Sequence, residues 1–321
     1  MTAHNHGNHQ PQSHVSSKQA RLMRLATYAS ATVAILLIIA KLIAWMMTDS
    51  ITILATLIDS CLDAAASLIT LFAVHHALQP ADKEHRFGHG KAEALAGLGQ
   101  SMFIAGSSVF LLLESINRLL HPKDLEVLNI GIVVMLISIA LTAGLIAFQQ
   151  HVVRQTGSTA IAADSIHYKT DLLVNVGVII ALLLAMYGWA GFDPIFAIAI
   201  AFYILHSAWE IASTAIDQLM DKELSDEDRA SIKQLATSHP EVKGIHDLRT
   251  RKAGLTNFIQ FHLELDGQLS LMQAHTIADE VEATIKATWT DAEVIIHEDP
   301  HGLQEPTPNF ADHSDKTKET S

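Results

Sequence analysis

The sequence contains a single cysteine, Cys61, among 321 residues, and this cysteine lies inside an apolar run. One thiol excludes a disulfide framework and a thiolate zinc cluster within one chain. Any metal chemistry must therefore use carboxylates and imidazoles, and the chain has 19 histidines. Charged residues are also scarce, at 17%, whereas 49% of the residues are hydrophobic and the mean hydropathy is +0.26. This composition excludes an ordinary soluble protein and predicts membrane spans joined to a soluble domain.

Basic residues become fewer relative to acidic ones toward the C-terminus. Residues 1–220 contain 14 acidic and 11 basic residues, whereas residues 221–321 contain 20 and 10. The last third therefore carries most of the net charge of -13. An acidic polar region argues against nucleic acid as a partner and suits cations.

Both ends of the chain lack apolar periodicity, so we expect disordered tails at residues 1–20 and 301–321. The first tail holds four histidines, His4, His6, His9 and His14. We interpret it as a solvated polar segment, with weak metal scavenging as the alternative. It has no apolar h-region of a signal peptide, so the first hydrophobic run is expected to remain as an anchor.

A transmembrane domain is expected over residues 21–220, where six apolar runs reach the roughly 20 residues that a bilayer requires. These runs cover residues 22–47, 51–78, 92–120, 127–153, 159–187 and 192–219. Six spans place both termini on one side of the membrane. Lys and Arg gather on that side, in the N-terminal flank and the connection 79–91. The positive-inside bias therefore places both termini in the cytoplasm.

A soluble domain is expected over residues 221–300, where the periodicity changes. In FIQFHLELD, apolar and polar residues alternate, which is the period of a half-buried strand. The predicted elements are a helix opened by Ser225, two strands, a second helix and a third strand. They cover residues 225–238, 243–251, 255–266, 270–288 and 292–297. The predicted fold is thus an all-α six-helix membrane bundle followed by an α+β, ferredoxin-like αββαβ domain.

Two pairs of ionisable residues interrupt the predicted spans. Asp59 and Asp63 in LIDSCLDAAAS are four residues apart and share a helix face, as do His167 and Asp171 in ADSIHYKTD. Ionisable groups in a span are costly and usually mark an ion or proton path. Three carboxylates and one imidazole can form a tetrahedral site for a divalent metal. The alternative is hydrogen bonding between helices through protonated acids.

The single imidazole of this set bears on the choice of metal. An all-oxygen site suits Mg²⁺ or Mn²⁺, whereas one nitrogen ligand favours Zn²⁺, Cd²⁺ or Fe²⁺. Cys61 lies two residues from each aspartate and so points to another helix face, where a packing role is expected.

A second group of ligands is predicted in the loop QPADKEHRFGHGKAE. Asp82, His85 and His89 follow one another at spacings of three and four, and Gly88 and Gly90 allow the backbone to fold back. These residues are candidates for a metal site at the membrane surface. A solvated loop without metal is the alternative.

A third group lies in the soluble domain. Four histidines and one aspartate occupy strand positions or nearby ones: His246, His262, His275, His297 and Asp299. They predict a metal cluster, with ordinary surface residues as the alternative. Residues 297–301 read HEDPH and match the H-E-x-x-H pattern of zinc proteases, which works only on a helix. Because this match follows the strand-like run EVII and contains Pro300, a protease is not expected.

Three stretches together resemble the cation diffusion facilitator family: LIDSCLDAAASL, LQPADKEHRFGHGKAEALA and ADSIHYKTD. The resemblance covers essentially residues 20–300 and implies that the αββαβ domain is metallochaperone-like. It implies a transport site of Asp59, Asp63, His167 and Asp171, a loop site of Asp82, His85 and His89, and a binuclear cytoplasmic cluster of His246, His262, His275, His297 and Asp299. It also implies that Lys91 and Asp221 form a charge interlock between the membrane halves of a dimer. The histidine-bearing N-terminus and Lys169, beside the transport motif, depart from the family pattern.

The resemblance implies a transporter rather than an enzyme. We expect a homodimer in the bacterial inner membrane that exports Zn²⁺, or Fe²⁺ or Cd²⁺, in exchange for protons by alternating access. Zn²⁺ is expected both as transported ion and as structural metal. The alternative is a membrane-anchored metal sensor, but an anchor has no use for four facing ionisable residues at membrane depth.

Overall fold

The computed structural model describes residues 17–48, 51–120, 129–186 and 192–303. The four N-terminal histidines and most of both predicted tails lie outside these residues. The described chain divides into two compact units, each with its own core. One runs to Lys222 and includes Ala253–Thr256, and the other comprises Glu223–Lys252 and the residues from Asn257 onward.

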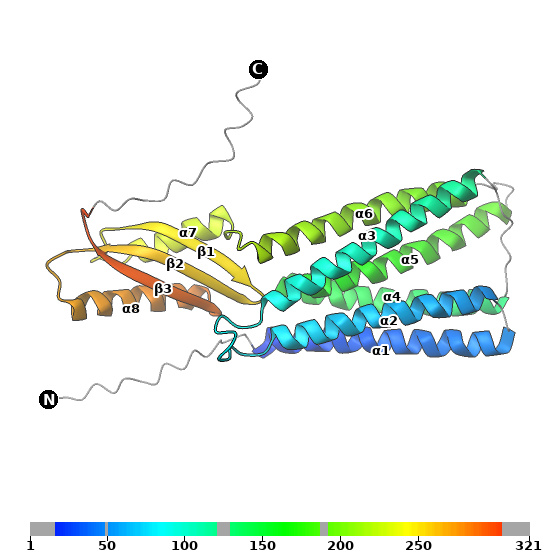
Figure 1. The fold of residues 1–321 in the computed structure, drawn as a ribbon, viewed down its shortest axis with the longest axis horizontal. Coiled ribbons are helices and arrows are strands. Elements are labelled where there is room, and N and C mark those ends of the chain that lie inside the picture. Colours follow the sequence, from blue (N-terminus) through cyan, green and yellow to red (C-terminus); the bar gives the residue numbers. More distant parts are fainter. Residues whose placement is uncertain (1–16, 49–50, 121–128, 187–191, 304–321) are drawn as a thin grey trace, which may run out of the picture. The chain divides into compact units, whose positions relative to one another are not determined.

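The first unit consists of six helices. They are α1 (Ser17–Thr48), α2 (Ile51–Ala77), α3 (Lys91–Leu120), α4 (Asn129–Thr156), α5 (Thr159–Met186) and α6 (Phe192–Leu219). Their ends lie within five residues of the ends predicted for the six spans, since long apolar runs leave little ambiguity. Figure 1 shows these helices running side by side as one bundle.

Helix α5 occupies the centre of the bundle. It contacts each of the other five helices, whereas α3 packs mainly along α6, and α1 packs along α2 and α4. Side chains on a central helix are shielded from lipid by their neighbours. The α5 residues Asp164 and His167 are accordingly buried. The bundle therefore provides an interior in which ionisable groups are surrounded by protein.

The outer surface of the bundle is apolar. Large side chains such as Ile35, Phe72 and Phe110 are exposed on it, as lipid-facing residues are in a membrane protein. Within the described residues, five helices are long and apolar enough to span a membrane. Helix α5 is not among these five and carries Asp164, Lys169 and Asp171 in its first half. The first unit is a membrane-spanning bundle whose central helix carries buried ionisable residues.

The second unit has the predicted αββαβ order: α7 (Asp226–Thr237), β1 (Gly244–Ala253), β2 (Thr256–Leu265), α8 (Leu271–Thr288) and β3 (Ala292–Pro300). Ser225 caps α7 by accepting a hydrogen bond from the Asp228 N–H, and Ser270 and Gln273 form a capping box at α8. The strand order is β1-β2-β3, with β2 and β3 parallel. HEDPH lies on β3 as far as Pro300, which confirms that it is not a helical zinc-protease motif.

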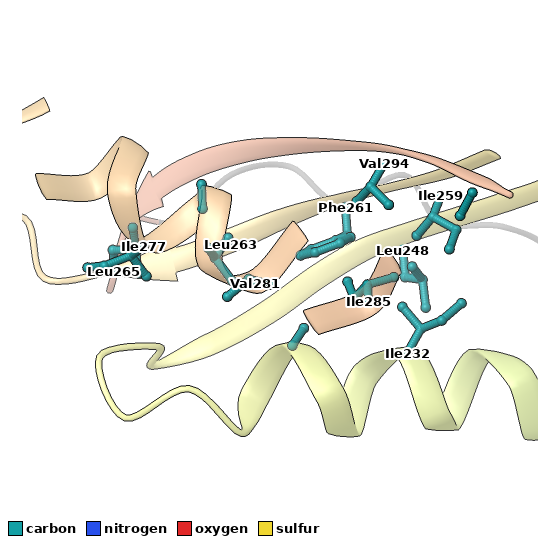
Figure 2. Packing of buried hydrophobic residues seen from close by; sticks show 13 residues of the cluster. Ile232, Leu248, Ile259, Phe261, Leu263, Leu265, Ile277, Val281, Ile285 and Val294 are labelled. Carbon is teal, nitrogen blue, oxygen red and sulfur yellow. The ribbon is translucent and has the colours of Figure 1, made fainter. Parts of the chain in front are cut away.

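The core of the second unit lies between the sheet and its two helices. Figure 2 shows Phe261 and Leu263 of β2 meeting Val281 and Ile285 of α8, with Ile232 of α7 beside them. Alternate residues of β2 are buried, as the period of FIQFHLELD predicts. The polar residues of β2 therefore point to the opposite face of the sheet, where the candidate ligands gather.

Candidate metal sites

The intramembrane site is formed where α2 meets α5. Asp63, His167 and Asp171 each offer a ligand atom within 4.8 Å of the others. The Nε2 atom of His167 lies 2.9 Å from Asp63 Oδ1 in a hydrogen bond. The side chains of Asp63 and His167 are only 19% and 8% exposed. The two predicted pairs thus do face one another, with three of their four members in close contact.

Asp59, the fourth predicted member, is exposed and does not belong to this 4.8 Å group. It lies one turn before Asp63 on α2. Cys61 is also exposed and is not part of the group. Asp59 would have to turn toward the other three residues to act as a ligand, and its place at the transport site stays a prediction.

A lysine lies beside this site that the sequence analysis did not single out. Lys41 of α1 donates to Ser60 Oγ at 2.6 Å and to the Thr56 carbonyl at 3.0 Å. Its ammonium group interacts electrostatically with the carboxylates of both Asp63 and Asp171. A single lysine in an apolar run gives no spacing signal. Its position on the helix next to α2 makes it a cation near the carboxylates.

Asp164 forms a second polar centre in the bundle, one turn before His167 on α5. It is 1% exposed. Oδ2 accepts hydrogen bonds from Ser30 Oγ and Gln149 Nε2, both at 2.6 Å. Oδ1 lies 3.3 Å from both Ser67 Oγ and Gln100 Nε2. One carboxylate therefore joins α5 to α1, α2, α3 and α4.

Lys169 points away from the candidate ligands. Its ammonium group donates to the hydroxyl of Tyr203 on α6 and lies 4.9 Å from the centre of that ring. Because Lys169 is two residues from His167, the helical period places it on a different face.

The three candidate ligands of the loop lie close together between α2 and α3, as their spacing predicts. Asp82, His85 and His89 each offer a ligand atom within 4.8 Å of the others. Asp82 Oδ1 accepts from the backbone N–H of His85 at 2.6 Å and of Glu84 at 2.9 Å. These hydrogen bonds, led by that from His85, hold the pKa of Asp82 below its usual value. The turn is closed by Gly88, whose φ of 79° suits glycine.

The register of the sheet places the third set of candidates side by side. His262 pairs with His297, and Glu264 pairs with Asp299 across the parallel strands β2 and β3. Paired residues share a sheet face, so all four lie opposite the apolar core.

His246 joins this face through a local break in β1. Strict alternation would place His246 on the same face as Leu248, which is part of the core. Asp247 has a φ of 45°, a left-handed conformation that aspartate tolerates better than most residues. The break redirects His246 toward Glu264, and its Nδ1 lies 3.0 Å from Glu264 Oε1.

Asp299 is the centre of the resulting cluster. His262 Nδ1 lies 2.7 Å from Asp299 Oδ2, His246 Nε2 lies 3.5 Å from the same oxygen, and His297 Nε2 lies 3.3 Å from Oδ1. His246, His262 and Asp299 each offer a ligand atom within 4.8 Å of the others. His275 is placed elsewhere, exposed on α8 and 3.6 Å from Asp279. Four of the five predicted ligands are thus brought together within this unit.

Glu264 and His301 extend the cluster beyond the residues predicted from sequence. His301 Nδ1 lies 2.8 Å from Glu264 Oε2, while His246 contacts the other oxygen. The hydrogen bond from His301, aided by that from His246, holds the pKa of Glu264 below its ordinary value. The register between β2 and β3 reveals this carboxylate, whereas the spacing of residues along the chain does not.

Lys91 and Asp221 form the predicted ion pair, with 2.9 Å between Lys91 Nζ and Asp221 Oδ1. Lys91 also donates to the Leu219 carbonyl at 3.3 Å. The pair joins the start of α3 to the residues that follow α6. Its part in holding a dimer together stays a prediction.

Two known protein families together match nearly the whole described chain. Residues 27–220 match the family described as the cation efflux transmembrane domain, and residues 224–301 match the cation efflux protein, cytoplasmic domain. The cation-efflux pump FieF of Klebsiella pneumoniae is 46% identical over 289 residues, which cover 90% of this chain and 96% of that protein. FieF of Shewanella oneidensis is 48% identical over 278 residues, which cover 87% and 94%. Among solved structures, the metal-bound C-terminal domain of the CzcD transporter from Thermotoga maritima is 27% identical, with a TM-score of 0.24, and matches 26% of this chain and 100% of that domain.

Proposed function

The chain belongs to the cation efflux family, whose members are transporters rather than enzymes, and we propose that it exports a divalent metal cation in exchange for protons. The observation that carries the proposal is the group of Asp63, His167 and Asp171 inside the membrane bundle. We assign these residues, with Asp59 as the fourth ligand, to the transport site. Ionisable side chains are costly to bury inside a membrane span, and residues of this kind typically mark an ion path.

The contact between His167 and Asp63 supplies the reason for exchange. The two atoms lie 2.9 Å apart, so a proton is shared between Nε2 and Oδ1 when no metal is bound. A metal that takes both atoms as ligands must displace that proton, because ligands have to be deprotonated. Metal and proton are therefore alternative occupants of one position. Loading of a site that carries an imidazolium His167 or a protonated Asp63 releases that proton on one side, and reprotonation releases the metal on the other.

The ligand types favour Zn²⁺, with Fe²⁺ and Cd²⁺ as further substrates. One imidazole among carboxylates suits borderline cations better than Mg²⁺ or Mn²⁺. The central position of α5 supports alternating access, because a movement of the surrounding helices would open this helix to either side.

In this proposal the other two sites bind metal that is not transported. The loop site and the cluster around Asp299 hold structural metal, and the cluster lies in the region that matches the family's cytoplasmic domain. We further propose a homodimer in the bacterial inner membrane, with both termini in the cytoplasm and the Lys91–Asp221 pair as its interlock. His275 belongs to the proposed cluster only if a rearrangement or a second protomer brings it there.

A membrane-anchored metal sensor is the rival function. A sensor needs the cluster around Asp299 but gives no reason for Asp63, His167 and Asp171 to meet in the bundle. Proteoliposomes that contain a pH-sensitive dye separate the two functions. An inward zinc gradient should drive protons out of the vesicles, and an imposed pH gradient should drive zinc uptake. Zinc movement that is indifferent to the pH gradient would contradict exchange, and its complete absence would favour the sensor.

A further inference from the structure

The last turn of α2 carries two adjacent histidines, His75 and His76, that belong to none of the sites above. The ring of His76 lies 4.5 Å from that of His89, centre to centre, in an edge-on contact. The ring of His85 lies 4.7 Å from that of His89. His89 is therefore flanked by two imidazoles, one from the loop and one from the end of α2.

These separations are those expected of imidazoles that share a metal. With Zn–N distances of about 2.0–2.1 Å, two imidazoles at a tetrahedral angle have ring centres roughly 5 Å apart. In the cluster around Asp299, the rings of His246 and His262 are 4.9 Å apart, and those of His262 and His297 are 4.7 Å apart. By this measure His76 is as close to the loop site as the proposed ligands of the cluster are to one another.

His89 supplies a second, independent observation. Its side chain is only 4% exposed, and Nε2 lies 3.3 Å from Asp82 Oδ2. Nδ1 is buried and has no hydrogen-bond partner among the residues that the structure describes. Buried polar atoms are nearly always paired, so an unpaired imidazole nitrogen beside two other imidazoles indicates a missing ligand. A cation fits this position, since neutral imidazole nitrogens are metal ligands.

We propose that His76 is the fourth protein ligand of the loop site, which it completes with Asp82, His85 and His89. The inference rests on the loop-site part of the proposed function. Three imidazoles and one carboxylate form a closed set for Zn²⁺ or a similar borderline cation. His76 is exposed, so its ring can turn to bring a nitrogen onto the metal without displacing packed side chains.

The fourth ligand changes what the loop site does. Three protein ligands leave a position for water or an exchanging ligand, whereas four close the site, as in structural zinc centres. A closed site ties the end of α2 to the turn that precedes α3. The loop metal then holds this connection in place and does not lie on the route of the transported ion.

The test uses the full-length chain in detergent, with Asp63→Ala, His262→Ala and Asp299→Ala as a background that leaves the loop site to bind Zn²⁺. His76→Ala and His75→Ala are compared in this background by competition with a chromophoric zinc chelator. His75 is a matched control, because it is exposed on the same turn. We expect zinc affinity to fall at least about tenfold in His76→Ala, since loss of even an outer partner of a ligand costs 10–100-fold. His75→Ala should leave it unchanged.

A second measurement keeps the inference testable if the alanine variant folds poorly. X-ray absorption at the zinc edge should count three imidazoles at the loop site in the background chain and two in His76→Gln. Unchanged affinity and an unchanged imidazole count in the His76 variants, with weaker binding in Asp82→Ala, would overturn the role of His76 and leave the loop site standing. If Asp82→Ala also binds zinc normally, both the loop metal site and the role of His76 in it are wrong.

Discussion

Replacement of Asp164 by alanine should destabilise the membrane bundle more than any other single removal of a polar group described above. The carboxylate receives hydrogen bonds from Ser30 and Gln149 and lies 3.3 Å from Ser67 Oγ and Gln100 Nε2. The serine hydroxyls can rotate and bond to one another, because Ser30 Oγ lies 3.0 Å from Ser67 Oγ. Among the residues that the structure describes, the amide nitrogens of Gln100 and Gln149 have no other acceptor than Asp164.

The cost can be worked out from these two amides. Gln100 is held by Thr70, whose hydroxyl donates to Oε1 at 3.0 Å, so its amide cannot turn without breaking that bond. Gln149 is 1% exposed. Each buried donor left unpaired costs about 1–3 kcal/mol, which gives about 2–6 kcal/mol for Asp164→Ala. Asp164→Asn should cost less, because it keeps one acceptor oxygen and its amide can donate to the unpaired Gln149 Oε1.

The assay is unfolding by SDS in mixed micelles, followed by tryptophan fluorescence, on wild type and both Asp164 variants. Thr32→Ala is the control, because that hydroxyl is exposed and donates to the Tyr28 carbonyl of its own helix. Its effect should stay within about 0.5 kcal/mol. A cost below about 1 kcal/mol for Asp164→Ala, or an equal cost for Asp164→Asn, would refute the reasoning about the unpaired amides.

Two further predictions concern the metal ligands. His167→Asp should shift transport from Zn²⁺ toward Mn²⁺, because it replaces the imidazole nitrogen with oxygen; an unchanged ranking in a flux assay with both metals would show that geometry sets selectivity. The double variant His262→Ala with Asp299→Ala should lose metal from the cytoplasmic cluster while Asp63 and His167 still bind it. Spin labels on the two protomers of the proposed homodimer should then report a longer distance between their cytoplasmic domains, because the acidic faces repel without metal. Unchanged metal stoichiometry would remove these residues from the ligand set. An unchanged distance between the labels would show that metal at the cluster does not hold the two domains together.

The order and bounds of the helices and strands follow closely from the sequence. Long apolar runs define the six spans, and the alternation in FIQFHLELD defines β2, because burial on one face imposes a period on the chain. The same rule fails at His246. The left-handed backbone of Asp247 turns this residue to the opposite face, and a local conformation of that kind leaves no mark in the alternation.

The candidate sites are only partly predictable. Spacing shows that Asp59 and Asp63 share a face of α2, but the distance from each to α5 depends on how all six helices pack. The structure accordingly groups Asp63 with His167 and Asp171 and leaves Asp59 exposed. Asp164 lies one turn before His167, so the spacing along the chain predicts that the two residues lie near each other on α5. Its partners are single serines and glutamines on four other helices, which form no pattern along the chain.

Zinc flux into proteoliposomes, measured for wild type, Asp63→Ala and Cys61→Ala, tests the central claim most directly. Cys61→Ala is the matched control, because this residue is exposed on the same helix and lies outside the ligand group. The account predicts that Asp63→Ala abolishes flux, since it removes one of the four proposed ligands, while Cys61→Ala transports at the wild-type rate. Wild-type zinc flux in Asp63→Ala, with an equal amount of protein in the same oligomeric state, would contradict the assignment of the transport site.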